Sequence, residues 1–349
     1  MSHFSIFSFE TLKLDRKVPA ALLLSLALLL AVEFGLARQD WVWGWIAQSP
    51  SGIFDAIEQQ LIIPARDPAV IIMGSSRVQG AAGPRILEQA LDLPNGSVLN
   101  LAMTSGRPFD ALMLYERNRD KLSKARVLVF EVAEFQFNGG FSPSERERRF
   151  ATLDQRLSLY DSRNTLDMTV GWVWRTYDAQ GPLRRLLKSA VSPPITELKI
   201  TEDGCVDWRT ETLERGPLDY DVAPEVKSMY HRFSLSQARV DNLRRLIELA
   251  QADGLKVILI QTPVRDTFVD LVNASHAEQY ASYVQATDNL TPGLPVQRWW
   301  RASELGIAPT DYYDYGHLTR SGTRIFTLAL ADRLKTLAPE ALRPPSPSP

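Results

Sequence analysis

The sequence has few of the residues that bind metals or form cross-links. Among its 349 residues there is one cysteine, Cys205, which excludes an intrachain disulfide and any cysteine cluster for zinc or an iron–sulfur centre. The four histidines are widely spaced, at His3, His231, His276 and His317. We therefore expect neither a metal site nor a cofactor.

Basic charge is not in excess either. Lysine and arginine number 39 against 41 aspartates and glutamates, so the formal net charge is −2. The basic residues are scattered rather than gathered in a stripe, which sets nucleic-acid binding aside. Hydrophobic residues make up 45% and charged residues 23% of the chain, as in ordinary globular proteins, so the chain can bury one large core or two modest ones.

One long apolar run occupies residues 18–37, with the sequence VPAALLLSLALLLAVEFGLA. A helix needs about 20 such residues to cross the hydrocarbon core of a membrane, so the run predicts a transmembrane signal-anchor. It is preceded by Lys13, Arg16 and Lys17. The positive-inside rule then places residues 1–17 in the cytoplasm and everything after the run outside. The outer interface would receive three tryptophans, Trp41, Trp43 and Trp45.

Two other interpretations of this run remain open. Gly35-Leu36-Ala37 is a passable small-x-small cleavage site, so the run could be a cleaved signal peptide. A buried helix of a soluble protein is the third option, although a core helix rarely carries this length of apolar surface on every side. The anchor and the signal peptide both place the rest of the chain outside the cytoplasm.

Beyond the run, strand-like and helical segments alternate. Residues 38–65 suggest a juxtamembrane linker with a short helix, and a domain over residues 66–338 follows. The predicted strands are 69–73, 97–101, 126–132, 255–262 and 295–299, and the predicted helices are 84–91, 108–122, 237–252 and 322–337. This alternation is typical of a parallel α/β sheet with helices on both faces.

The alternation breaks between Asn138 and Phe233. We predict that this stretch is an insertion over the carboxyl edge of the sheet, where loops shape substrate sites, or else a structural excursion without that role. The proline-rich end of the chain, residues 339–349, is predicted to be disordered.

Two short motifs could carry chemistry. Gly74-Ser75-Ser76-Arg77 directly follows the apolar residues 69–73, and the carboxyl end of a strand is where a parallel sheet exposes a nucleophile. Near the end of the chain, Asp314 and His317 are spaced so that both side chains can lie on one side of a loop or a first helical turn. A serine hydroxyl needs a histidine to take its proton and a carboxylate to orient the ring. We therefore predict a triad of Ser76, His317 and Asp314.

With these motifs the chain resembles the SGNH, or GDSL-like, hydrolase superfamily, whose first block places its serine after a strand and whose last block is Asp-x-x-His. The resemblance implies a three-layer, flavodoxin-like parallel sheet. The second block is matched by residues 100–106, NLAMTSG, which implies that the N–H groups of Gly106 and Ser76 stabilise the oxyanion. There are two departures. Ser75 stands where the family usually has aspartate, and no asparagine ends the third block, where Gln136 or Asn138 could substitute.

These departures, together with the anchor and the insertion, make the chain similar to membrane-anchored SGNH proteins that act with membrane-bound O-acyltransferases. Examples are the D-alanine transfer protein of teichoic-acid systems and the alginate O-acetylation proteins. The resemblance implies transfer of an acyl group, acetyl in the first instance, to or from an exported polysaccharide or other acylated glycan through a seryl ester. It also implies a membrane-bound O-acyltransferase as partner and a single pass through a bacterial inner membrane, with the catalytic domain periplasmic or extracellular.

Two alternatives to this function remain open. One is a catalytically idle protein that binds glycan or serves as a scaffold for a membrane O-acyltransferase. The other is a secreted GDSL-type carboxylesterase.

Four residues are weaker candidates for contact with substrate. Arg77 follows Ser76 and Arg107 follows Gly106, so either arginine could hold an anionic sugar or acyl donor. The alternative is that they are solvated or cap a helix. His231 precedes a predicted helix. Tyr315 lies within the Asp314–His317 motif and could stack on a sugar ring or pack in the interior.

Overall fold

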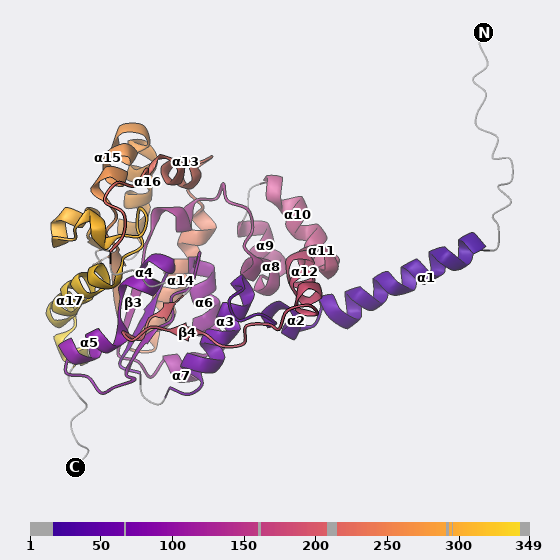
Figure 1. Ribbon diagram of the computed structural model, residues 1–349, viewed down its shortest axis with the longest axis horizontal. Helices are drawn as coiled ribbons and strands as arrows, with labels where there is room; N and C mark the ends of the chain where they lie inside the picture. The colour runs from indigo at the N-terminus through magenta and orange to yellow at the C-terminus, as the bar shows by residue number, and fades with distance from the viewer. Residues whose placement is uncertain are drawn as a thin grey trace, which may run out of the picture.

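A parallel sheet lies at the centre of the computed structural model of this chain (Figure 1). The structure describes residues 17–65, 68–159, 162–207, 215–290, 293–294 and 296–342. Within these residues the sheet has five strands in the order β2 (Val98–Asn100), β1 (Val70–Met73), β3 (Val127–Glu131), β6 (Lys256–Gln261) and β7 (Val296–Arg298). All neighbouring strands are parallel, and this is the flavodoxin-like order. The predicted α/β fold class is confirmed.

The sheet is buried on both faces, which explains why its strands are continuously apolar. In β1, Ile71 and Met73 point to one face and Val70 and Ile72 to the other. The first face packs against α3 (Pro50–Ile57), α6 (Pro108–Arg117) and α14 (Gln237–Ala252). The second face packs against α5 (Pro84–Ala90) and α17 (Arg320–Leu337). The result is three layers.

The observed elements match the predicted segments closely, with one helix divided. The predicted helix 108–122 breaks at Asn118, where φ is −118° and ψ is 26°, and α7 (Arg119–Leu122) follows. The Asn118 amide donates to Leu114 O at 3.1 Å and to Glu58 Oε1 at 3.0 Å, so its side chain competes with the helical backbone.

Residues 38–65 are not a linker. They form α2 (Asp40–Gly44), α3 and the π-helix η2 (Glu58–Ile62). Ile53, Phe54 and Ile57 are at most 2% exposed and belong to the core on one face of the sheet. This segment is therefore part of the folded domain.

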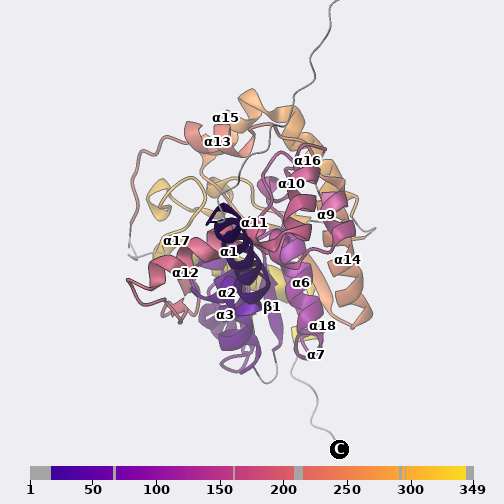
Figure 2. The ribbon, with the colours of Figure 1, turned by 90° about the vertical axis from the view of Figure 1, so that its right-hand side faces the viewer.

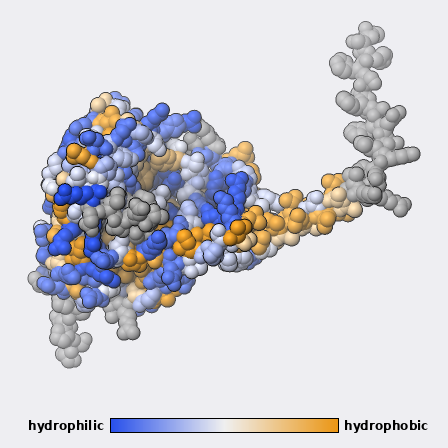
Figure 3. Space-filling view, in the orientation of Figure 1, coloured by the Kyte–Doolittle hydropathy of each residue, from blue (hydrophilic) through white to orange (hydrophobic). Residues whose placement is uncertain are grey.

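The apolar run forms α1 (Lys17–Val32), which continues into the π-helix η1 (Glu33–Ala37) and projects from the body of the molecule (Figures 1 and 3). Residues Ala20–Ala37 are long and apolar enough to cross a membrane, and only 11% of this 18-residue window is buried. A signal sequence near the N-terminus passes the same test. The exposure argues against a core helix.

The stretch between Asn138 and Phe233 folds mainly as helices. They are α8 (Glu145–Phe150), α9 (Leu153–Leu159), α10 (Ser162–Val173), α11 (Arg175–Asp178), α12 (Gln180–Ser189) and α13 (Ala223–Met229), with a hairpin of β4 (Lys199–Ile200) and β5 (Val206–Asp207). Its first part contacts the carboxyl edge, since Arg146 Nη2 donates to Thr104 O at 3.0 Å. Helices α9 to α12 lie instead where α1 leaves the body, so the predicted position over the carboxyl edge does not hold for them (Figure 2).

The remaining elements are short helices and two further helices near the carboxyl edge. They are α4 (Ser76–Ala81), η3 (Glu134–Phe137), α15 (Asp266–Ser275), α16 (Ala277–Asp288), η4 (Ala302–Leu305), η5 (Pro309–Asp311) and α18 (Pro339–Leu342). The predicted disorder of residues 339–349 falls partly on α18, and its remainder, like residues 1–16, lies outside the described residues.

Candidate active site

The predicted nucleophile lies in a tight turn between β1 and α4. Gly74 has a φ of +153°, and a Cβ there would lie 2.6 Å from Glu131 Cβ and 2.8 Å from Val78 Cγ1, so only glycine fits without rearrangement. Ser75 caps α4, its Oγ accepting the N–H of Arg77 at 3.2 Å. Ser76 is the first residue of α4 and is half-buried. The turn sits where strand order reverses between β1 and β3, the position at which such sheets bind ligands.

Three side chains form a hydrogen-bonded chain at this edge. Ser76 Oγ lies 2.8 Å from His317 Nε2, and His317 Nδ1 lies 2.7 Å from Asp314 Oδ2. The His317 side chain is 12% exposed and that of Asp314 25% exposed. The structure thus brings together residues separated by most of the chain in the order that nucleophilic catalysis requires.

The Asp314 carboxylate is held in its charged form. Its Oδ1 accepts the N–H groups of Gly316 at 3.0 Å and of His317 at 2.8 Å. Burial by itself raises the pKa of Asp314, but the hydrogen bond from the His317 ring, the charge of His317 and these two N–H groups outweigh it and lower the pKa to about 2. The carboxylate can therefore fix the His317 tautomer that leaves Nε2 free to accept a proton from serine.

The loop that carries Asp314 and His317 is fixed from outside. Arg265 donates from Nε to Asp314 O at 2.7 Å, and its backbone N–H donates to Tyr315 O at 2.9 Å. Tyr313 N–H donates to His317 O at 2.8 Å. The backbone of the loop therefore fixes the positions of Asp314 and His317 relative to each other.

Sequence reasoning did not single out Glu131, the last residue of β3, which is fully buried. Its Oε2 accepts the Ser75 N–H at 2.7 Å and the Ser75 Oγ–H at 2.6 Å, and its Oε1 accepts from Thr262 Oγ1 at 2.8 Å. Glu131 therefore braces the turn that carries Ser76. The signal for it was a single carboxylate within the apolar segment VLVFEV.

The predicted oxyanion donors are only partly available. The N–H of Gly106 donates to Met103 O at 2.8 Å, so it does not point at the serine in this conformation. Gln136 and Asn138 do not replace the missing asparagine. The Gln136 amide donates to Gly106 O at 3.1 Å, and the Asn138 amide donates to Met229 O at 2.9 Å. The backbone N–H of Ser76 has no acceptor among the described residues, which leaves it as the group free to meet an oxyanion.

Arg77 has a structural position rather than the substrate contact considered above. Its guanidinium is 1% exposed and pairs with Glu134 at 2.8 Å. It also lies over the rings of Phe135 and Tyr315, at 5.2 and 5.0 Å from their centroids. Burial lowers the pKa of Arg77, but the charge of Glu134 outweighs this and raises the pKa further. Arg77 links α4 to the loop that carries the histidine.

Tyr315 packs in the interior, the second of its two predicted positions. It is 7% exposed, stacks on Phe268 at 4.9 Å and meets the His317 ring edge-on at 6.1 Å. Burial raises the pKa of Tyr315 to about 12 even though the charge of Arg77 lowers it. Its hydroxyl accepts from Arg77 at 3.4 Å. Tyr315 therefore packs against the His317 ring rather than offering a face for a sugar.

Arg107 and His231 lie apart from the triad contacts. Arg107 lines a groove of about 500 Å³ that also contains Thr104 and Ser105, and its guanidinium pairs with Glu147 at 2.5 Å. His231 is exposed in the turn after α13. Among the described residues, no group of three or more histidine, cysteine, aspartate or glutamate side chains is placed to hold a metal ion.

Comparisons with known proteins leave the family open. No protein-family model matches the chain, and no curated protein matches its sequence. Among solved structures, one match is the crystal structure of a "putative acylhydrolase" from Bacteroides fragilis NCTC 9343, with 12% sequence identity and a TM-score of 0.38. The match covers 83% of this chain and 97% of the other. A TM-score this low does not support a common fold or function. The fold class follows from the observed strand order, and the candidate site follows from its own geometry.

Proposed function

We propose that this chain is a membrane-anchored serine O-acyltransferase or esterase that acts on acyl esters, acetyl in the first instance, of an exported polysaccharide or other glycan. The observation that carries the proposal is the Ser76–His317–Asp314 chain, with heavy-atom distances of 2.8 and 2.7 Å. These distances lie within the range in which a base can take the proton of a nucleophile.

In the proposed reaction, Ser76 Oγ attacks the acyl carbonyl carbon while its proton passes to His317 Nε2. Collapse of the tetrahedral intermediate breaks the ester C–O bond, and His317 returns the proton to the departing alcohol. Water or a sugar hydroxyl then gives its proton to His317 and attacks the seryl ester. The bond between Ser76 Oγ and the acyl carbon breaks, His317 returns the proton to Ser76 Oγ, and the acid or the new ester is released. Asp314 stays charged throughout and stabilises the protonated ring.

The oxyanion would be met by the N–H groups of Ser76 and Gly106. The Ser76 N–H has no competing acceptor among the described residues. The Gly106 N–H must leave Met103 O, and this requires a turn of the Ser105–Gly106 peptide when substrate binds. Ser105 already has a φ of +55°, which places strain at this hinge.

Two observations support an uncleaved anchor in a bacterial inner membrane with the catalytic domain outside the cytoplasm. Lys13, Arg16 and Lys17 precede the apolar helix, as the positive-inside rule expects. Cleavage after Ala37 would also remove Glu33, whose carboxylate accepts the N–H groups of Arg175 and Thr176 at 2.9 and 2.7 Å. A membrane-bound O-acyltransferase that supplies the acyl group would be within reach of a catalytic domain anchored in this way.

The test is to treat the full chain in detergent with a fluorophosphonate probe and with p-nitrophenyl acetate. We expect wild type to be labelled and to release p-nitrophenol, and Ser76→Ala to lose both, because the nucleophile is absent. Ser303→Ala, which removes an exposed serine hydroxyl outside the triad, is the matched control and should behave as wild type. Equal labelling of wild type and Ser76→Ala would contradict the proposal that this chain is an enzyme with Ser76 as its nucleophile.

Transfer and hydrolysis are separated by supplying an acylated donor together with an unacylated glycan. Acylated glycan that appears only with wild type indicates transfer, and free acid alone indicates an esterase. Intact mass of the protein from its native membrane then separates the anchored form from a secreted GDSL-type carboxylesterase, since cleavage would remove the N-terminal residues.

A second candidate function is a catalytically idle glycan-binding or scaffold protein for a membrane O-acyltransferase. It is favoured by the engagement of the Gly106 N–H with Met103 and by the side chains of Gln136 and Asn138, which are committed elsewhere. This candidate predicts no labelling of Ser76 together with binding of glycan, or of the acyltransferase, by both wild type and Ser76→Ala.

A further inference from the structure

The end of the molecule from which α1 leaves carries an exposed apolar face on α10. Leu166, Val170 and Val173 are 73%, 41% and 60% exposed. Their spacing of four and then three residues places them on one side of the helix. Exposed apolar side chains gathered on one side of a helix are typical of a surface that contacts a membrane or another protein.

The same end carries further exposed apolar side chains. On α10 to α12 and the residues that follow they are Trp172, Tyr177, Leu187 and Val191, and at the foot of α1 they are Phe34, Trp41 and Trp45. Figure 2 looks towards this end and shows α10, α11 and α12 arranged around α1. Exposed apolar side chains are therefore found both at the base of α1 and on the insertion helices that surround it.

Glu33 couples α1 to this face. Its side chain is fully buried, and its carboxylate accepts the backbone N–H groups of Arg175 and Thr176 as well as the Thr176 hydroxyl at 2.8 Å. It also pairs with Arg38 at 2.8 Å. Glu33 thus fixes the start of α11, and with it the end of α10, next to the C-terminal end of α1.

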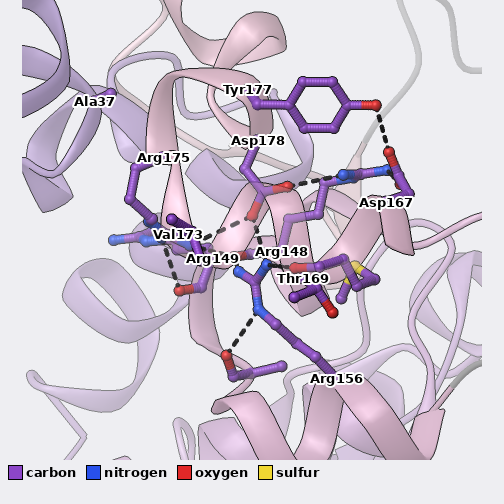
Figure 4. Close-up of polar contacts among 12 residues, drawn as sticks. Ala37, Arg148, Arg149, Arg156, Asp167, Thr169, Val173, Arg175, Tyr177 and Asp178 are labelled. Carbon is purple, nitrogen blue, oxygen red and sulfur yellow. Dashed lines mark hydrogen bonds and ion pairs between the residues drawn. The ribbon is translucent and has the colours of Figure 1, made fainter. Parts of the chain in front are cut away.

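A buried ion-pair cluster holds together the helices that surround α10 (Figure 4). The Asp178 side chain is 0% exposed and pairs with Arg148 at 2.8 Å and with Arg156 at 2.7 Å. Arg175 lies 3.5 Å from the same carboxylate. These contacts join α8, α9 and α11 into one unit, because separating them would leave buried charges without partners.

Basic side chains lie on α12, which contacts α11. Arg184 and Lys188 are exposed on α12, one turn apart. Exposed lysine and arginine beside a membrane-spanning helix are attracted to anionic lipid headgroups. Apolar residues next to basic ones on surface helices are the pattern of segments that lie in the membrane interface.

We propose that α10, α11 and α12 dock onto the outer surface of the bilayer, with Leu166, Val170 and Val173 inserted among the lipid headgroups and upper acyl chains. The inference rests on the proposed membrane crossing of α1. A second copy of the chain or a protein partner is a less direct occupant, because the face lies at the level where α1 leaves the body. Attachment through both α1 and the α10–α12 face would fix the tilt of the domain relative to the membrane. Ser76 would then be held at a set distance from the membrane surface and would meet esters presented at that distance.

The test measures depth in lipid for the full chain reconstituted into nanodiscs of phosphatidylethanolamine and phosphatidylglycerol. A fluorophore is attached to Leu166→Cys, Val170→Cys or Val173→Cys, and quenching is recorded with a lipid that carries a nitroxide near its headgroup. For the reference at position 26, which lies deeper in the proposed span, the lipid carries the nitroxide on its acyl chain. The wild-type chain, whose Cys205 is buried, serves as the labelling blank. Leu26→Cys on α1 and Leu328→Cys, at an exposed position on α17 at the opposite end, are the references.

We expect a several-fold greater loss of fluorescence at the three α10 positions than at position 328. Quenching at position 26 together with α10 labels that match position 328 would overturn the docking and leave the anchor standing. Loss of quenching at position 26 as well would overturn the anchor. If iodide in solution cannot reach the α10 labels and the nitroxide lipid does not quench them, a protein covers this face and the proposal is wrong.

Discussion

Ser75 occupies a position that disfavours a carboxylate, and the neighbouring Glu131 gives a physical reason. Glu131 Oε2 lies 2.6 Å from Ser75 Oγ, and both residues are fully buried. An aspartate at position 75 would bring a second carboxylate against the first, and two buried carboxyl groups this close together cannot both stay charged. The carboxylate beside the nucleophile turn is therefore supplied by β3 and not by the turn itself.

This arrangement predicts that Ser75→Asp lowers the free energy of unfolding by about 3 kcal/mol, since it adds an unpaired buried charge. Glu131→Gln in the same chain should recover more than half of that loss, because the amide no longer repels the new carboxylate. The measurement is a double-mutant cycle of unfolding free energies. Additive losses in the double variant would show that the two positions do not interact.

At the scale of elements, α3 belongs to the folded domain because its apolar residues have a place on the sheet. Sequence reasoning placed residues 38–65 in a linker because they follow an apolar run and no strand had yet appeared. A surface for Ile53 and Phe54 exists only once β1 and β3 are assembled, so its presence could not be inferred from the segment alone.

We predict that Phe54→Ala lowers the free energy of unfolding by about 3–5 kcal/mol, as for other fully buried phenylalanines. Phe54 is 0% exposed, whereas Ile63 in the same segment is 48% exposed. Ile63→Ala is therefore the matched control, with an expected change within about 0.5 kcal/mol. The measurement is thermal or denaturant unfolding of the two variants. Equal losses of unfolding free energy would show that residues 38–65 are a linker and not part of the folded domain.

The contact between α4 and the loop that carries His317 is also a matter of elements. Arg77, one residue after Ser76, pairs with Glu134 and lies over the ring of Tyr315. The sequence shows an arginine next to a serine and leaves open whether it faces substrate. Only the packing of η3 and the loop around it decides that it does not.

For the whole molecule, the lowered pKa of Asp314 predicts how stability changes with pH. The pKa falls from 3.8 to about 2 on folding, so the native state binds this proton less readily than the unfolded state. The resulting stabilisation is complete above the unfolded pKa and disappears as pH falls through the folded one. At about 1.4 kcal/mol per pKa unit, it is on the order of 2 kcal/mol.

We therefore expect the difference in unfolding free energy between wild type and Asp314→Asn to shrink by on the order of 2 kcal/mol as the pH falls from about 5 to about 2. The measurement is unfolding of both chains over this range. A difference that stays constant to the acid end would mean that Asp314 is not held as a charged group. The same variant should lose roughly 10³–10⁴-fold in kcat, because the amide favours the wrong His317 tautomer.

What the sequence determined by itself is local or periodic. The apolar strands, α14, the glycine turn at Gly74 and the Asp314–His317 spacing all arise from residues close together in the chain, and the strand–helix alternation is enough for a parallel sheet. The tertiary structure alone decided that Glu131 braces Ser75, that the Gly106 N–H is engaged by Met103, and that α10 to α12 lie at the end of the molecule from which α1 leaves. These depend on contacts between distant segments, whose partners are set by three-dimensional packing rather than by local sequence pattern.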